Sequence, residues 1–145
     1  MSLIDKIKEL CNQANSEYIF SHNTMLDENK QSQYKQMSDK FVWLEERKSG
    51  YFTAKYQLKK VTNFVLYICT MIDGQIQDTA DDREIVRETM QSEFIVPFIK
   101  LFMESELLPT SESGIVSMPF DEPLPIFDNY AVVEILQIKC EEPLC

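Results

Sequence analysis

The chain has 145 residues, of which 44% are hydrophobic and 26% are charged, a composition that fits one folded domain and excludes wholesale disorder. Three glycines are too few for the many tight turns of a β-sandwich or barrel, so they favour a helical protein. The net charge of −10 argues against nucleic acid and anionic membranes as partners, because phosphate binding requires a basic face.

The charge is unevenly distributed along the chain. Residues 1–77 carry ten Lys or Arg and nine Asp or Glu, whereas residues 78–145 carry four and fifteen. Residues 47–60 differ from both halves, because they contain five basic side chains and no acidic one. We interpret this basic run as a solvated face or, alternatively, as a docking strip for an acidic protein.

The first predicted element is a helix near the N-terminus, because apolar residues recur there at steps of three and four. These residues are Ile4, Ile7, Cys11, Ala14 and Tyr18. Polar residues 21–24 then break the pattern, and Thr24 with Asp27 resembles the cap of a second helix.

The same rhythm continues over residues 34–76. Its positions are Tyr34, Met37, Phe41, Leu44, Lys48, Tyr51, Lys55, Leu58, Thr62, Val65, Cys69, Ile72 and Ile76. One helix over this range would be roughly 65 Å long and would need a partner helix, most simply from a second copy. Ser49 and Gly50 leave another possibility, a turn between two antiparallel helices. The pattern predicts either a long dimerisation helix or a helical hairpin.

Residues 61–72 are apolar on more than one helical face, which predicts a core segment enclosed by other helices. A polar break follows at residues 78–82, and then a further helical stripe. The stripe consists of Ile85, Val86, Met90 and Phe94. Pro97 either kinks this helix or begins a new one.

The C-terminal part has a different character. Pro119, Pro123 and Pro125 exclude helix, while residues 130–138 are rich in β-branched side chains and predict a strand. Residues 115–118 suggest another strand. The predicted fold is therefore mainly α: a long helix or helical hairpin plus a short helical bundle, with a small C-terminal β element. The helical body spans residues 1–109, and the extended or β region spans residues 110–145.

No group of residues indicates catalysis. The single histidine, His22, lies in a polar break and is interpreted as a solvated loop residue. The cysteines include no Cys-x-x-Cys pair, and Cys69 is interpreted as a core residue. Carboxylates such as Glu141 and Glu142 are interpreted as solvated charges, whereas an enzyme would need a buried one. We predict no enzyme activity, no cofactor and no metal site.

The sequence also predicts a cytoplasmic location. The N-terminus is amphipathic and charged, unlike a signal peptide. The longest apolar run, Phe64 to Cys69, is far shorter than the ~20 residues of a membrane span. Four cysteines without metal-type pairing fit reduced thiols in such a compartment.

Several segments resemble the GrpE family, the nucleotide exchange factors of DnaK-type chaperones. Phe41 followed by residues 44–48 is similar to an aromatic-then-basic stretch of that family's long helix. Residues 55–66 are similar to the segment that continues it, and residues 119–122, Pro-Phe-Asp-Glu, to its Pro-Phe-Asp turn. Residues 132–137, Val-Val-Glu-Ile-Leu-Gln, resemble a strand of its small β-domain. The histidine that usually follows the turn is absent.

The resemblance implies a homodimer that binds a DnaK-type chaperone and promotes nucleotide exchange. It implies helix pairing through Leu58, Val65, Cys69 and Ile72, and chaperone contacts from Phe120, Asp121, Val132, Val133 and Glu134. We therefore expect a non-catalytic protein-binding protein, with GrpE-like exchange as its most specific form. The alternative is a compact helical-bundle adaptor, inhibitor or viral or phage accessory protein without exchange activity.

Overall fold

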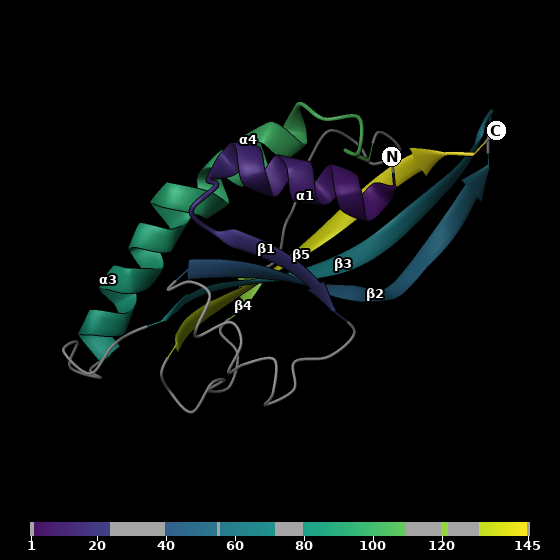
Figure 1. Cartoon of the computed structure of the whole chain (residues 1–145). Helices are drawn as coiled ribbons and strands as arrows, with labels where there is room; N and C mark the ends of the chain where they lie inside the picture. Colours follow the sequence, from purple (N-terminus) through teal and green to yellow (C-terminus); the bar gives the residue numbers. More distant parts are fainter. Residues whose placement is uncertain are drawn as a thin grey trace.

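Strands from the N-terminal, central and C-terminal parts of the chain form one five-stranded β-sheet (Figure 1). The computed structural model describes residues 2–23, 40–54, 56–71, 80–109, 120–121 and 131–144. Its strands are β1 (Ile19–Asn23), β2 (Lys40–Ala54), β3 (Leu58–Met71), β4 (Phe120–Asp121) and β5 (Ala131–Pro143). They lie in the order β1-β2-β3-β5-β4, with β1 parallel to β2 and the other neighbours antiparallel.

The prediction of a mainly helical protein is wrong, because strands rather than helices form the part of residues 34–76 that the structure describes. β2 and β3 make an antiparallel hairpin that runs from the Lys40–Thr70 pair to the Ala54–Leu58 pair. The described residues between 40 and 71 form neither a coiled coil nor a helical hairpin. Gly50 lies inside β2, opposite Thr62, and not at the turn. The predicted positions Tyr34, Met37, Ile72 and Ile76 lie outside the described residues.

The amino acids of this hairpin explain why it is not helical. Valine, isoleucine, threonine and the aromatic residues, which favour strands, are frequent in both β2 and β3. The three-four rhythm does not identify a helix here, because the positions between its members are often apolar too. Residues 41–44 and 64–69 are unbroken apolar runs, and such runs also fit strands that are buried on both faces.

The N-terminal helix predicted from the first stripe is present as α1 (Leu3–Ala14). It begins at a capping box, in which the Asp5 N–H donates to Ser2 Oγ at 3.1 Å and the Ser2 N–H donates to the Asp5 carboxylate at 3.3 Å. Ile7 and Cys11 are its buried residues. Tyr18 lies beyond the helix end but is fully buried.

The second helical element is continuous and consists of α3 (Ala80–Met90), a π-helical turn η1 (Gln91–Ile95) and α4 (Val96–Met103). Within η1, the Val96 N–H donates to the Gln91 carbonyl, five residues earlier. Pro97 therefore neither ends this helix nor begins a separate one. It lies in the first turn of α4, directly after the π turn.

The core is built on both faces of the sheet. On the helix-covered face, α1 and α4 lie across the strands (Figure 1). The cluster there includes Ile7, Cys11, Val42, Leu44, Phe64, Leu66, Ile68, Phe94, Phe98, Phe102, Leu136 and Ile138. On the opposite face, Phe41, Trp43, Cys69 and Val133 are also buried, and the rings of Trp43 and Tyr67 lie 4.7 Å apart. Burial on both faces accounts for the unbroken apolar runs.

The strand predicted at residues 130–138 is present as β5 and extends to Pro143. It pairs with β3 from the Met71–Ala131 pair to the Lys59–Pro143 pair. Residues on both sides of the predicted boundary at residue 109 therefore share one sheet. The prolines at 119, 123 and 125 and the possible strand at 115–118 lie outside the described residues.

Candidate functional site

The outer edge of β2 has no partner strand among the described residues over its second half. β1 pairs with β2 only from Phe41 to Glu45, and an irregularity in the β2–β3 register then separates Glu45 from Ser49. From Ser49 to Ala54, β2 continues along β3, while no strand of the described residues pairs with its other side. We call residues 49–54 the β2 edge. Five of its six residues are exposed, and the sixth is partly exposed.

Exposed aromatic side chains gather at this end of the sheet. Phe52 is 66% exposed and Tyr51 is 40% exposed, and they point to opposite faces because side chains alternate along a strand. Tyr56 and Leu58, at the turn that joins β2 to β3, are 94% and 46% exposed. An open strand edge with exposed aromatic side chains is a template for pairing with another chain.

The close approach of β2 to β3 at Gly50 shapes the β2 edge. A Cβ atom at Gly50 would clash with the Val61 carbonyl oxygen, so a side chain at this position would force the strands apart. A hollow of about 310 Å³ opens beside this glycine. It is lined by Ser49, Gly50, Tyr51, Phe52, Lys60, Val61 and Thr62. Because Gly50 has no side chain, the two strands lie close together at this position, next to the hollow.

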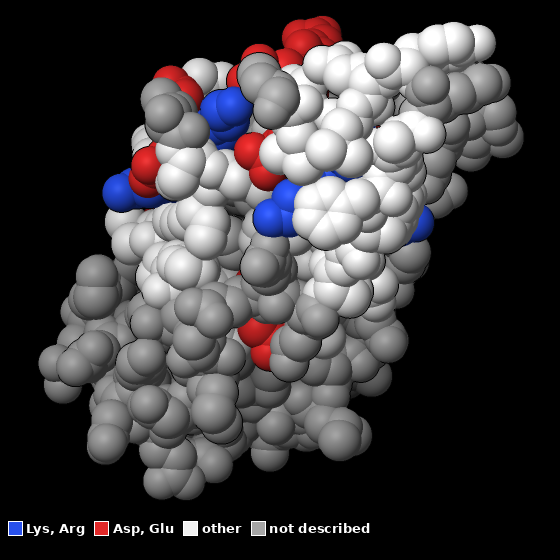
Figure 2. All heavy atoms as spheres, turned by 90° about the vertical axis from the view of Figure 1, so that its right-hand side faces the viewer, with Lys and Arg blue, Asp and Glu red and all other residues white. Residues whose placement is uncertain are grey.

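The surroundings of the β2 edge are basic in sequence. The edge lies within residues 47–60, the run with five basic side chains and no acidic one. Figure 2 views the molecule from this end, where much of the described surface is uncharged and both Lys or Arg and Asp or Glu side chains lie beside it. Lys59 is engaged, because its Nζ lies 2.9 Å from the Glu141 carboxylate.

Two carboxylates are buried, which corrects the prediction that Glu141 is a solvated charge. Glu141 and Glu134 are each 5% exposed. Glu141 pairs with Lys59, and Glu134 accepts a hydrogen bond from Gln91 at 3.5 Å. Neither residue lines the hollow beside Gly50. Because both carboxylates have polar partners, we interpret them as structural residues and not as candidates for acid–base chemistry.

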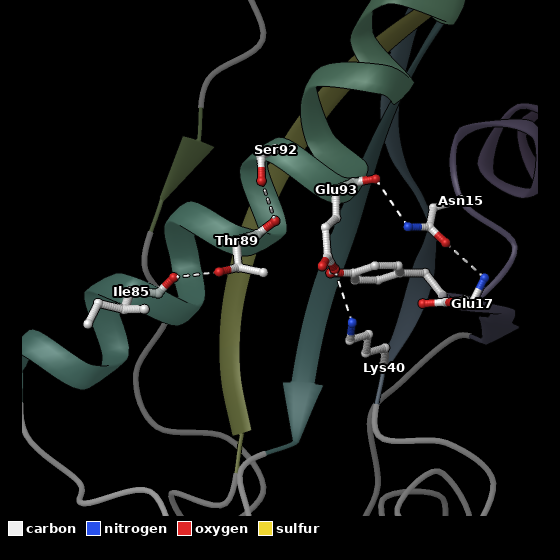
Figure 3. A network of polar contacts seen from close by, with 8 residues as sticks. Asn15, Glu17, Lys40, Ile85, Thr89, Ser92 and Glu93 are labelled. Atoms are coloured by element: carbon white, nitrogen blue, oxygen red, sulfur yellow. Dashed lines mark hydrogen bonds and ion pairs between the residues drawn. The ribbon is translucent and has the colours of Figure 1, made fainter.

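A second polar cluster joins the π turn to the sheet (Figure 3). The Glu93 carboxylate accepts a hydrogen bond from Tyr18 Oη at 3.1 Å and forms an ion pair with Lys40 Nζ at 3.0 Å. Burial and the neighbouring Glu93 charge raise the pKa of Tyr18. These contacts connect three parts of the fold: β2, η1 and the segment that follows α1. Each of these polar groups has a partner. We assign this cluster to the fold.

The structure separates the residues predicted to pair helices. Leu58, Val65 and Cys69 all lie on β3, but Leu58 faces the opposite way from the other two because strand side chains alternate. Leu58 is exposed at the turn, Val65 is partly buried and Cys69 is fully buried. Their spacing would place them on one stripe of a helix, whereas a strand divides them. Ile72 lies outside the described residues.

The residues predicted to contact a chaperone lie on two neighbouring strands. Phe120 and Asp121 form β4, which pairs with β5 through the Phe120–Leu136 and Asp121–Ile135 pairs. Val132, Val133 and Glu134 lie on β5, and the last two are 5% exposed. Buried side chains are unavailable to a partner on the folded protein, so Val133 and Glu134 belong to the interior.

Sequence reasoning did not select the β2 edge. The three-four rhythm puts Tyr51 on a helical stripe and does not include Phe52. A signal was present, because three aromatic residues, Tyr51, Phe52 and Tyr56, are interleaved with the basic run. His22 is another correction: it lies in β1 opposite Leu44, and its Nε2 atom is buried.

Within the described part of the chain, no three His, Cys, Asp or Glu residues come together in an arrangement that suits a metal ion. None of the helices described is both long and apolar enough to pass through a bilayer. Cys11, Cys69 and Cys140 are buried free thiols, so Cys69 is a core residue as predicted. Neither a model of a known protein family nor a curated protein matches the chain.

Proposed function

We propose that the chain is a non-catalytic protein-binding protein that receives an extended segment of a protein partner along the β2 edge. The observation that supports this most directly is the open stretch from Ser49 to Ala54, beyond the end of β1, with Tyr51 and Phe52 exposed on it. A strand added to a sheet edge gains affinity from main-chain hydrogen bonds and specificity from alternate side chains.

The two aromatic residues suit this mode because they point to opposite faces of the sheet. A segment lying along the β2 edge would contact Tyr51 on one face and Phe52 on the other. Aromatic side chains contribute a large share of the binding energy at protein interfaces. The hollow beside Gly50, on the same strand as the two aromatic residues, offers space for a side chain of the partner.

Charge indicates the chemistry of the partner. The β2 edge lies in a run of five basic residues without an acidic one, while the whole chain carries −10. The basic run favours an acidic extended segment at this edge, whereas the net negative charge of the chain disfavours such a segment elsewhere. We propose an acidic, strand-forming peptide segment of another protein as the partner.

Selection from a random peptide library on the purified chain tests the proposal. Selected peptides are expected to be acidic and rich in strand-forming residues. Their affinity, measured by fluorescence polarisation, is expected to fall by about tenfold or more in Phe52→Ser. Ile85→Ser is the matched control, because Ile85 is 62% exposed on α3 and distant in sequence. Peptides methylated on alternate main-chain nitrogens should lose binding, because strand addition uses those N–H groups.

Two results would remove the proposal. One is equal affinity of the selected peptides for the wild type, Phe52→Ser and Tyr51→Ser. The other is slowed hydrogen exchange on peptide binding at residues other than 49–54. Light scattering distinguishes a second copy of this chain as the occupant, because the chain would then associate without added peptide.

Nucleotide exchange on a DnaK-type chaperone stays a prediction. The described part of residues 40–71 contains no long helix that would pair with a second copy of the chain. Helix pairing therefore supports neither the exchange activity nor the predicted homodimer. Its test is independent of the β2 edge: the purified chain either accelerates nucleotide release from a purified chaperone or does not.

A further inference from the structure

A second cavity, of about 440 Å³, lies on the helix-covered face at the same end of the sheet. Its lining comes from four elements: Ser2, Leu3 and Ile4 at the start of α1, His22 of β1, Lys60, Thr62 and Phe64 of β3, and Glu142 of β5. Small-molecule sites in proteins commonly have volumes in this range and mix apolar walls with a few polar groups.

Two buried polar atoms of the lining have no hydrogen-bond partner among the described residues. Thr62 is 2% exposed, and its Oγ1 is unpartnered. The Nε2 atom of His22 is likewise buried and unpartnered. A buried polar atom without a partner is costly, and most native structures avoid it. Thr62 and His22 both belong to the lining, and a polar ligand group seated between them would supply the partner that each atom lacks.

Two opposite charges also line the cavity. Lys60 and Glu142 are partners in the β3–β5 register, and both are partly exposed. Among the described residues, no ion pair forms between Lys60 and Glu142. In contrast, Lys59 and Glu141, which precede them by one position on each strand, form an ion pair of 2.9 Å. The ammonium and carboxylate groups are thus both accessible to one small molecule.

The N-terminus of α1 does not supply the anion site. Ser2 Oγ accepts from the Asp5 N–H and donates to the Asp5 carboxylate at 2.8 Å, so the first turn already has its own acceptor. The Asp5 carboxylate also lies there and repels a second anion. A ligand carboxylate is therefore attracted to Lys60 and not to the helix end.

We propose that this cavity binds a free α-amino acid with an apolar side chain. Lys60 Nζ, Thr62 Oγ1 and His22 Nε2 donate to the ligand carboxylate. Glu142 accepts from the ligand ammonium group. The apolar side chain lies against Leu3, Ile4 and Phe64. One occupant of this chemistry accounts for both charges, both unpartnered atoms and the apolar wall.

Titration calorimetry on the purified full chain, with four probes, tests the ligand class. L-leucine and L-phenylalanine carry both charges, 3-phenylpropionate lacks the ammonium group and phenethylamine lacks the carboxylate. We expect at least one amino acid to bind about tenfold or more tightly than either single-charge analogue. Absence of binding by all four up to about 10 mM, or equal binding of phenylalanine and its two analogues, would overturn the proposal.

Three variants test the assigned contacts. Thr62→Val removes only the hydroxyl, so amino-acid affinity is expected to fall about fivefold while the free protein stays as stable or becomes more stable. Glu142→Gln should abolish the preference for phenylalanine over 3-phenylpropionate, and Lys60→Met the preference over phenethylamine. Lys100→Met, at an exposed position on α4, is the control and should leave affinity unchanged. Unchanged affinity in Thr62→Val would assign the ligand elsewhere.

The two proposals fail separately. Phe52→Ser alters the β2 edge but not this cavity, and Glu142→Gln alters the cavity but not the edge. Hydrogen exchange in saturating amino acid is expected to slow near residues 2–4 and 60–64. Slowing confined to residues 49–54 would contradict the assignment of the cavity.

Discussion

The side-chain amide of Asn15 donates a hydrogen bond to the main-chain carbonyl of Glu93 at 3.2 Å. In a regular α-helix that carbonyl would accept from the N–H of residue 97, four residues later, but Pro97 has no N–H. Figure 3 shows Asn15 reaching the helix from the segment after α1. Asn15 also accepts from the Glu17 N–H at 3.0 Å, so one amide group serves both segments.

Replacing Asn15 with Asp is expected to reduce the free energy of unfolding by about 1–2 kcal/mol. The aspartate keeps the acceptor for the Glu17 N–H but loses the donor to the Glu93 carbonyl. Urea denaturation measures the loss. In a Pro97→Ala background the chain regains a main-chain donor, so the same substitution should cost less. Equal costs in the two backgrounds would contradict the role assigned to Asn15.

Replacing Gly50 with Ala is expected to destabilise the fold by about 2 kcal/mol, because the added Cβ meets the Val61 carbonyl oxygen and the strands must separate. Thermal and urea denaturation both measure this. Gln57→Ala, at the exposed turn of the same hairpin, is the control and should change stability by no more than about 0.5 kcal/mol. A Gly50→Ala protein as stable as the control would show that the approach of the two strands is not tight.

Replacing Lys59 with Met should cost about 2 kcal/mol, because it leaves the buried Glu141 carboxylate without its ion-pair partner. The cost is below that of a fully buried pair because the Lys59 side chain is 28% exposed. Adding Glu141→Gln to this variant should recover part of the loss, since the residue left behind is neutral. A double variant whose loss equals the sum of the single losses would exclude coupling between the two residues.

The stability of the protein is expected to decline above about pH 10. Burial, together with the Glu45 charge and hydrogen bond, raises the pKa of Tyr67 to about 12. A raised pKa means that the folded state holds its proton longer than the unfolded state does. The contribution is therefore complete below the unfolded value of about 10 and is lost as the pH rises towards 12.

Urea midpoints at about pH 9 and about pH 11 measure this decline, which Tyr67→Phe should reduce. Tyr56→Phe is the control, because Tyr56 is 94% exposed. The assignment to Tyr67 is wrong if the Tyr67→Phe protein loses stability between these pH values as steeply as the wild type and the Tyr56→Phe control do.

Three thiols are expected to resist alkylation in the folded protein. Burial raises the pKa of Cys11 and of Cys69, and burial with the Glu142 charge raises the pKa of Cys140 to about 12. A Cys145→Ser variant treated with iodoacetamide at about pH 8 should gain no adduct by mass spectrometry, because thiolates are the reactive form. The same variant in urea should gain three adducts. Rapid labelling of the folded variant would place at least one thiol at the surface.

The sequence correctly predicted the elements whose residue pattern fits only one type of secondary structure. The prediction failed where the pattern fits both a helix and a strand. The stripe through Ile7 and Cys11 identified α1, and the β-branched run at 130–138 identified β5. In β2 and β3, apolar residues stand at consecutive positions, so helical and strand periods fit equally well. The structure shows strands whose side chains are buried on both faces of the sheet.

The candidate sites depend on contacts that no local pattern reveals. Thr62 and His22 are ordinary polar residues until β1 and β3 place them beneath the start of α1. The openness of the β2 edge depends on where β1 stops, which follows from its parallel pairing with Phe41–Glu45. The exposed aromatic residues of the basic run were the one signal that the sequence offered.

The central place of β3 imposes an order on how the protein is made. β2 and β3 are both complete once residue 71 has been synthesised, but the other edge of β3 has no partner until β5, whose first residue is Ala131, has been synthesised. Throughout synthesis of the helical element, the nascent chain therefore carries an unpaired apolar strand edge from Phe64 to Cys69. A chain that stops before Ala131 keeps that edge permanently, so truncated products are expected to aggregate and be degraded rather than to persist as a smaller domain.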